Sequence, residues 1–369
     1  MKKRLLRVAV VLSAACFAGA AEKSGLEFHG SMYSDLGIVQ HYNEPGTDEF
    51  DFTGFSTLSL SFKNRNRRFG KVEGLLDLII PYGTAGEQLS GLLPTESVSD
   101  SATRSMVSLF SLRGTPVLLD FRKLSLSFYL PFVDITIGRQ IINFGKGTLF
   151  SPVDIFSTVD ITDLDFRRSG SDIVTFRFPF GPLSGCDIVA GIPQFDNSYS
   201  GAIKIFGTLA DFDLSLIGLH KDAGDSPFKT TETTAGFAFK GDIITGAYGE
   251  AVVHYDHDRK TEFFEGMFGL DYSIDDRWIF VGEYLYKEPG YNEYLWGNHT
   301  IFGSTQYVIN DIMNLSASII GNITDRRLIG TINYYYDILQ NVDTHLYIQG
   351  IESEAGTSLN YMIRFDVQF

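Results

Sequence analysis

Hydrophobic and polar residues alternate along most of this chain with a period of two residues. The last segment is a clear case, because positions 359, 361, 363, 365, 367 and 369 are aliphatic or aromatic and most positions between them are polar. The same alternation runs from 262 to 273, where Glu265 and Asp271 face away from a row of apolar residues. A period of two is typical of a β-strand with one apolar and one polar face. The pattern therefore predicts a protein built mainly of β-strands.

About 18 such segments can be counted, with 16 as the alternative count. They begin near residues 26, 50, 70, 119, 133, 171, 183, 200, 211, 230, 243, 262, 277, 296, 312, 327, 342 and 358. Connections after segments of even rank are mostly short and those after segments of odd rank mostly longer, with the longest at about 81–118 and 143–170. Transmembrane barrels sort their loops in this way, and soluble sandwiches have no reason to. We expect an all-β fold, a closed antiparallel transmembrane β-barrel over residues 21–369.

Composition and the first residues refine this picture. A mean hydropathy of +0.02 excludes a bundle of membrane helices, which would need repeated apolar runs of about 18 or more residues. Residues 1–20 have a basic head, an apolar run and the small residues Ala18-Gly19-Ala20, which is the order of a cleaved signal peptide. Cleavage there would remove four positive charges and change the net charge from −15 to −19. It would leave Cys186 as the single thiol, so no internal disulfide is expected.

The signal peptide, the aromatic alternating last segment and the terminal Phe369 together resemble the bacterial outer-membrane porin superfamily. This resemblance implies location in the outer membrane of a Gram-negative bacterium, contact with its lipid, and recognition of Phe369 as an assembly signal by the barrel assembly machinery. A local pattern, Gly138-Arg139-Gln140 followed by Phe144-Gly145 and by residues 151–154, is similar to one in alginate-export-like large channels. Self-association into a homo-oligomer is left open.

Alternate residues of each predicted strand should face lipid or the lumen. Charged residues on the lumen phase require water there, because a charge against a dry core is costly. A barrel of about 16–18 strands is wide enough for a water-filled channel. The acidic excess on this phase predicts a preference for cations. The expected lumen-lining residues are Asp77, Lys123, Asp134, Arg177, Asp187, Lys204, Lys240, Glu250, Glu265, Asp271, Glu283, Arg364 and Asp366.

The connection 143–170 is suited to fold into the lumen, because it combines aromatic residues with charged ones. In general porins the third long loop narrows the pore, and the resemblance implies that role here. Strict alternation puts Arg139 on the lipid phase with Ile135 and Ile137, and we expect a bulge at Gly138 to turn it inward. The alternative is that Arg139 reaches the headgroups at the rim. The expected constriction residues are Lys146, Asp154, Asp160, Asp163, Asp165, Arg167, Arg168 and Arg139.

These features predict a porin that forms a water-filled channel for passive diffusion of small hydrophilic solutes. Two alternatives stay open, a substrate-specific or polysaccharide-export channel and a structural or adhesive outer-membrane barrel. No enzymatic activity is expected, because no Gly-x-Ser-x-Gly elbow is present and no histidine stands in a nucleophile motif. His254, Asp256, His257 and Asp258 could bind a cation, but polar loop ends commonly have this composition, so neither a metal nor a cofactor is expected. Nucleic acid is not an expected partner.

Overall fold

The computed structural model describes residues 25–42, 50–64, 70–84, 106–112, 115–154, 156–157, 159, 164, 166–191, 198–224, 230–242, 244–290, 298–324, 326–353 and 356–369. The expected signal peptide, residues 1–20, lies outside these described residues. None of the described residues forms a helix that is long and apolar enough to cross a membrane.

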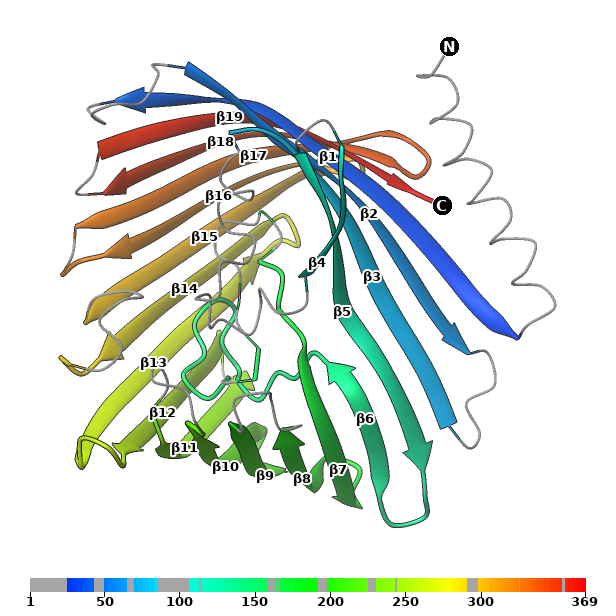
Figure 1. The fold of residues 1–369 in the computed structure, drawn as a ribbon. Helices are drawn as coiled ribbons and strands as arrows, with labels where there is room; N and C mark the ends of the chain where they lie inside the picture. Colours follow the sequence, from blue (N-terminus) through cyan, green and yellow to red (C-terminus); the bar gives the residue numbers. More distant parts are fainter. Residues whose placement is uncertain are drawn as a thin grey trace.

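The described residues form nineteen β-strands (Figure 1). They are β1 (Leu26–Tyr42), β2 (Phe50–Asn64), β3 (Gly70–Gly83), β4 (Met106–Leu112), β5 (Thr115–Tyr129), β6 (Asp134–Gln140), β7 (Ser171–Gly181), β8 (Ser184–Gly191), β9 (Tyr199–Leu209), β10 (Phe212–Asp222), β11 (Glu232–Asp242), β12 (Gly246–Asp256), β13 (Thr261–Ile274), β14 (Trp278–Lys287), β15 (His299–Asn310), β16 (Met313–Asn322), β17 (Arg327–Leu339), β18 (Val342–Ser353) and β19 (Gly356–Gln368). Neighbouring strands in the described part of the chain pair antiparallel, as expected when hairpins connect successive strands.

Eighteen of these strands form a closed barrel, which confirms the predicted fold class and strand number. The wall closes because β1 pairs with β19, its last member. The remaining strand, β4, pairs with the first part of β5, while β3 pairs with the rest of β5. The connection expected at about 81–118 therefore contains β4, and it runs from the end of β3 at Gly83 to the start of β5 at Thr115. Residues 106–112 form a strand on the edge of β5 opposite β3, because β6 pairs only with residues 124–129 and leaves residues 115–120 of that edge free.

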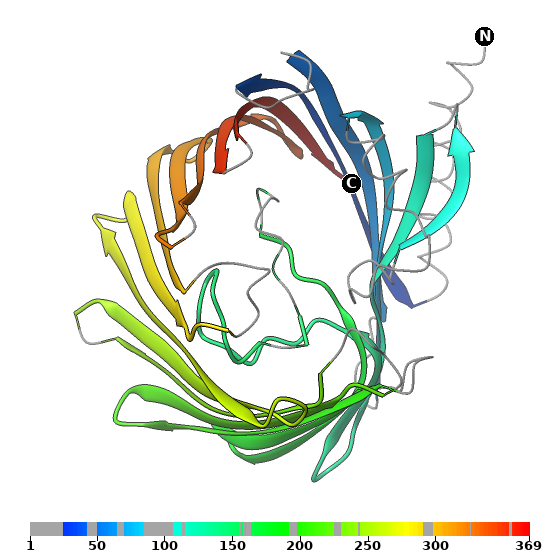
Figure 2. The same cartoon turned by 60° about the vertical axis from the view of Figure 1, so that its left-hand side comes forward.

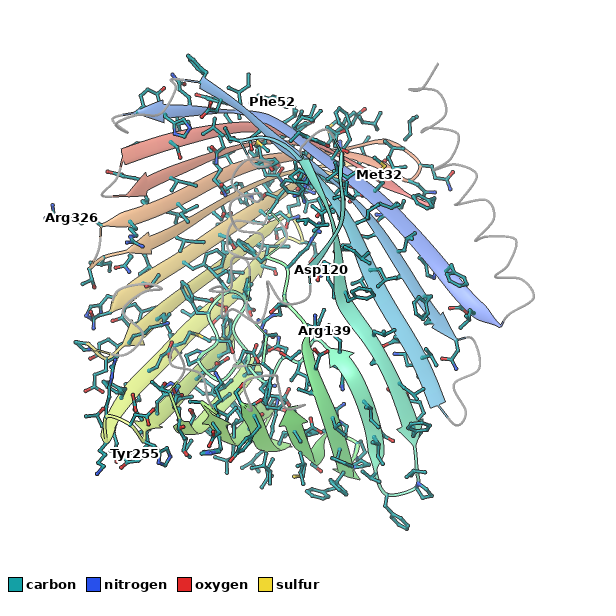
Figure 3. The ribbon with its side chains drawn as sticks, viewed as in Figure 1. Met32, Phe52, Asp120, Arg139, Tyr255 and Arg326 are labelled. Atoms are coloured by element: carbon teal, nitrogen blue, oxygen red, sulfur yellow. The ribbon has the colours of Figure 1, made fainter. Side chains whose placement is uncertain are left out.

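The two ends of the barrel differ in their connections, as the sequence predicts. One end, here called the turn end, has the short connections 130–133, 182–183, 210–211, 275–277, 311–312 and 340–341. The opposite end, the loop end, has the longer ones, including 141–170 and 288–298. Figure 3 labels Tyr255 and Arg326 at the loop end. The wall is uneven in height, since β1 has 17 residues and β6 has 7.

The outer face of the wall is apolar and the inner face carries the charges. Phe268, Tyr284 and Ile301 lie opposite one another on β13, β14 and β15, and all three side chains are exposed. Their neighbours in sequence on β13 and β14 include the buried carboxylates Glu265 and Glu283, which point inward. Apolar residues exposed in a continuous band, with charges inside, are the arrangement that a lipid surround favours.

The closing seam of the barrel ends at Phe369. Its backbone amide and carbonyl both bond to Gly30 of β1, each at 2.8 Å. The Phe369 ring covers Gly30, where a Cβ would lie only 2.1 Å from a ring carbon. Glycine is therefore required at this position because the terminal ring occupies the space of a side chain.

We predict that deletion of Phe369 weakens the closing seam, since it removes this reciprocal backbone pair. Refolding into detergent and measurement of the folded fraction by heat-modifiable gel mobility would show a loss relative to the natural chain. The matched variant Phe369→Ala keeps the backbone pair and removes only the ring, so it should refold better than the deletion. Equal refolding of the deletion variant and the natural chain would contradict the prediction.

Candidate channel constriction

The chain leaves the wall after Gln140, the last residue of β6, and returns to it at Ser171, the first residue of β7. The residues between them, 141–170, are called the lumen loop. Figure 2 shows the described residues of this segment inside the ring of strands. The described residues of the lumen loop contact the inner wall at several places.

Glu250 on β12 is the first anchor of the lumen loop. Its Oε1 accepts hydrogen bonds from the backbone amides of Lys146 (2.6 Å) and Gly147 (3.1 Å). Its Oε2 accepts them from the Ser151 hydroxyl (2.9 Å) and the Val153 amide (3.2 Å). The residue is only 3% exposed, so the loop shields this carboxylate from water. A buried carboxylate is tolerated when its oxygens are hydrogen-bonded, and these four donors meet that need.

Glu283 on β14 is the second anchor. Its Oε2 accepts hydrogen bonds from the amides of Leu149 (3.0 Å) and Phe150 (2.9 Å). Its Oε1 accepts them from the Thr148 amide and from the Tyr248 hydroxyl, the latter at 2.9 Å. Successive backbone N–H groups that converge on a carboxylate form an anion-binding concavity. Every amide from residue 146 to 150 is thus bound to one of the two wall glutamates.

Apolar side chains of the loop pack on the wall in two clusters. The first contains Phe144, Val153 and Phe156 and rests on β7–β12, and the second contains Leu149 and Phe150 and rests on β12–β16. The buried wall residues in these clusters are Ile173, Val189, Ala202, Ile217, Leu219, Ala238, Tyr248, Val252, Met267, Leu285, Phe302 and Ile320. This side of the lumen is therefore filled at the depth of the loop, because apolar surfaces meet there without water.

Residues 166–168 contact three separate parts of the wall. The Phe166 ring packs edge-on against the Phe302 ring of β15, with ring centroids 5.9 Å apart. The Arg167 guanidinium stacks on Tyr33 of β1. The backbone carbonyl of Arg168 accepts a hydrogen bond from Arg122 of β5 at 3.3 Å. β16–β19 lie between β15 and β1, and β2 and β3 lie between β1 and β5. This part of the loop therefore crosses the lumen instead of following the wall.

Tyr33 is held between two guanidinium groups. The Cζ of Arg167, from the loop, lies 4.2 Å from the ring centroid, and the Cζ of Arg364, from β19, lies 4.8 Å from it. Arg364 also forms a two-point ion pair with the fully buried Asp35, at 2.8 and 3.0 Å. The Tyr347 hydroxyl donates to the same carboxylate at 3.1 Å. Stacked cations of this kind are attracted by the ring's negative face, so Tyr33 tethers the loop to the far wall.

Asp154 joins the two parts of the lumen loop. Its carboxylate accepts hydrogen bonds from the Phe144 and Gly145 amides, and it pairs with the Arg168 guanidinium. Burial raises the pKa of the Asp154 carboxyl, and Arg168 and the two amides oppose that rise. Lys204 of β9 donates to the Phe144 carbonyl at 2.9 Å. The beginning and the end of the loop are thus connected to each other as well as to the wall.

Arg139 keeps the outward phase. The β5–β6 and β6–β7 registers run without a break and place Arg139 opposite Leu124 and Asp172. The bulge expected at Gly138 is therefore wrong. The Arg139 guanidinium donates to both carboxylate oxygens of Asp172, at 3.0 and 2.7 Å, and Figure 3 labels it near the loop end of β6. This bidentate pair satisfies the cation on the outer phase, so no inward turn is needed.

The bulge that turns a cation inward lies on the neighbouring strand. The register between β3 and β5 shifts at Leu75/Leu76 and leaves Arg122 as the extra residue between Phe121 and Lys123. The Arg122 guanidinium lies 3.6 Å from the carboxylate of Asp77. Arg122 is not among the residues expected from the sequence. The available signal was the run Phe121-Arg122-Lys123, where two adjacent cations break the alternation.

Four of the expected constriction residues, Lys146, Asp154, Arg167 and Arg168, belong to described parts of the lumen loop. The Lys146 Nζ lies 3.7 Å from Asp213 on the wall. Asp160, Asp163 and Asp165 lie outside the described residues. The role of this group in setting the narrowest point stays a prediction.

The lumen-lining role of the thirteen expected residues stays a prediction, but the strand registers place several of them side by side on one face. Asp134, Arg177, Asp187 and Lys204 are directly opposite one another on β6–β9. Several form cross-strand ion pairs: Lys123 with Glu73 at 2.6 Å, Arg177 with Asp187 at 2.8 Å, and Lys240 with Asp271 at 3.2 Å. Glu250 and Glu283 are covered by the loop. The acidic excess counted from the sequence therefore overstates the negative charge that lumen water meets.

The residues of the cluster 254–258 point to different faces. His254 is buried on the inner side, with Nδ1 2.7 Å from Glu232 and Nε2 3.5 Å from Glu265. His257 bonds through Nε2 to the Thr233 hydroxyl at 2.8 Å. Among the described residues, no group of three or more His, Cys, Asp and Glu side chains is placed to hold a metal ion.

The fold is that of outer-membrane porins. OccAB4 of Acinetobacter baumannii matches with a TM-score of 0.56 and 8% identity, over 93% of this chain and 98% of that chain. OccK9 (OpdG) of Pseudomonas aeruginosa matches with a TM-score of 0.58 and 9% identity, over 93% and 98%. OpdK of Pseudomonas aeruginosa, solved with vanillate, matches with a TM-score of 0.55 and 9% identity, over 93% and 99%.

No family model matches the chain, and no curated protein matches it in sequence. The local similarity to alginate-export-like channels is not shown by these comparisons. At such low identities the matches establish the fold.

We predict that Glu283→Ala loosens the lumen loop. The change leaves the amides of residues 148–150 without their acceptor, and each buried unsatisfied group costs roughly 1–3 kcal/mol. Single-channel recording in a planar bilayer should show a higher and noisier conductance than that of the natural chain. Glu262→Ala, which removes a carboxylate from the outward phase opposite Tyr255, is the control and should leave the trace unchanged. An unchanged trace for Glu283→Ala would mean that this anchor does not hold the loop.

A second prediction concerns the tether at Tyr33. Tyr33→Ala removes the ring between Arg167 and Arg364, so the loop should lose its contact with β1 and the conductance should rise. Tyr33→Phe keeps the stacked ring and should stay closer to the natural conductance, since a stacked cation contributes about 0.5–2 kcal/mol. Recordings of both variants under the same conditions provide the comparison. Identical conductances for the two would show that stacking does not position the loop.

Proposed function

We propose that this protein is a channel of the bacterial outer membrane through which small hydrophilic solutes cross by passive diffusion. The observation that carries the proposal is a closed barrel with an exposed apolar outer face and a charged inner face, crossed by a loop whose described residues cover only part of the lumen wall. An eighteen-strand wall encloses more space than its own side chains fill. The lumen loop narrows this space without being part of the wall.

The structural neighbours support the same proposal. They are porins, and OpdK was solved with vanillate, so a neighbour with this fold holds a small organic molecule. The proposed partners are outer-membrane lipid on the outer face and small hydrophilic solutes in the lumen. Recognition of Phe369 by the barrel assembly machinery and self-association stay predictions. We assign no catalytic role to any residue.

We further propose a preference for cations that arises at the turn end. Asp337, Asp343 and Asp366 lie opposite one another on the inward phase of β17, β18 and β19. In contrast to Glu250 and Glu283, these three residues are only partly buried. Carboxylate rings at a channel mouth favour cations because they lower the energy of a positive charge passing them.

The test is the reversal potential of the reconstituted channel in a potassium chloride gradient. We predict a sign that indicates cation preference for the natural chain, and a shift toward zero for the double variant Asp343→Asn/Asp366→Asn. Glu262→Gln removes the same kind of charge from the outer phase and should leave the reversal potential unchanged. A natural chain that refolds and gives no open-channel current would contradict the channel proposal and favour a structural barrel. A reversal potential of the opposite sign would contradict only the cation preference.

A further inference from the structure

The contacts of the lumen loop divide the inner wall into three arcs. The loop and its apolar clusters cover the wall from β7 to β15 and reach Ile320 on β16. The arc that contains β2 and β3 is packed at loop depth, where Thr57 is 1% and Asp77 2% exposed. The remaining arc, β16–β19, lies between the loop's contacts with Phe302 and Tyr33. Its inward residues are mostly half-buried, so at the depth of the loop this arc is the part of the wall that the described loop residues cover least.

Two neighbouring rows of inward residues on this arc and on β15 carry no charge. The first row, in cross-strand register, is Ser304, Ser318, Thr331, Gln349 and Asn360. The second row is Gln306, Ser316, Asn333, Tyr347 and Met362. Together these ten positions are called the uncharged wall. They differ from the inner positions on β6–β9, where acids and bases alternate in the corresponding row.

Hydrogen bonds within the uncharged wall are long. Asn333 Nδ2 lies 3.5 Å from the Ser316 hydroxyl, and Gln349 Nε2 lies 3.4 Å from the Thr331 hydroxyl. Asn360 Nδ2 lies 3.3 Å from Oε1 of the Gln349 side chain. Good hydrogen bonds of this type are about 2.7–3.2 Å, so these contacts are weak and can be exchanged for bonds to a solute. Hydroxyl and amide groups both donate and accept, which matches a solute that carries hydroxyls.

We propose that the uncharged wall is a binding face for neutral polyhydroxylated solutes of monosaccharide size, such as sugars and polyols. This inference rests on the proposed channel function and names the solute class that the channel favours. A neutral hydroxylated solute exchanges its hydrogen bonds with water for those of the wall without loss of a charge's hydration. A charged solute of the same size finds no counter-ion in these two rows. The solute preference is thus set by hydrogen bonding on one arc, and the ion preference by the aspartates nearer the turn end.

The experiment uses the full chain in liposomes and three probes of nearly equal size, glucose, gluconate and glucosamine. Flux is measured by liposome swelling, and small-ion conductance is measured separately in planar bilayers. We expect glucose to enter faster than both charged analogues. The double variant Asn333→Leu/Gln349→Leu should lower the glucose rate by roughly 3–10-fold relative to its own ion conductance, because apolar groups at these positions cannot exchange hydrogen bonds. Thr305→Val removes a hydroxyl from the outward phase beside Gln306 and is the matched control.

The outcomes separate the two proposals. Absence of ion conductance in refolded natural chain would overturn the channel function. Normal ion conductance with glucose slower than glucosamine would overturn the neutral-solute inference alone. An unchanged ratio of glucose flux to ion conductance in the double variant would do the same. If the double variant fails to refold, Asn333→Leu alone is compared with Thr305→Val by the same ratio, and equality of the two overturns the inference.

Discussion

Burial of two wall carboxylates under the lumen loop is the interaction on which the interior of this barrel depends. Glu250 and Glu283 would be unstable in a dry setting without donors, and the loop amides from 146 to 150 would be equally unstable without acceptors. Each set satisfies the other, so neither the wall charges nor the loop backbone can be placed independently. The apolar clusters on both sides exclude water and thereby strengthen these bonds. Loop position and wall sequence are therefore coupled.

This coupling changes the meaning of the net charge. A formal charge of −15 describes the whole chain, but an acid that is buried and hydrogen-bonded contributes little to the field in open water. Asp35 is neutralised by Arg364, and Asp187 by Arg177. What a solute meets is the set of residues that remain after such pairing and covering. On the arc β16–β19 this set is largely uncharged, with acids concentrated nearer the turn end.

The sequence alone predicts the barrel well, because a period of two identifies both the strands and their inward residues. Every segment start expected from the alternation lies within a few residues of a strand in the structure. Period alone does not reveal β4, since its pairing depends on how much of one edge of β5 the short strand β6 leaves free. The period also places the bulge at Gly138 and turns the wrong arginine inward, because a bulge depends on the register between two strands and not on one strand alone. Arg139 forms an ion pair with Asp172 of β7 on the outward phase, and Arg122 is the arginine that points inward, toward Asp77.

The apolar inner positions of β7–β16 explain how one loop defines the solute path. In an evenly polar lumen a loop could lie against any part of the wall, because water would compete equally for each. Here Ile173, Val189 and Val252 offer an apolar surface inside the barrel, and burying it against Phe144 and Val153 removes that surface from water. The loop is thereby drawn to one side, and open water is left to the opposite arc. On that arc the inward residues at this depth are uncharged and polar, and they include Ser318, Thr331 and Gln349. The asymmetry of the inner wall thus determines both where the loop binds and what chemistry lines the remaining passage.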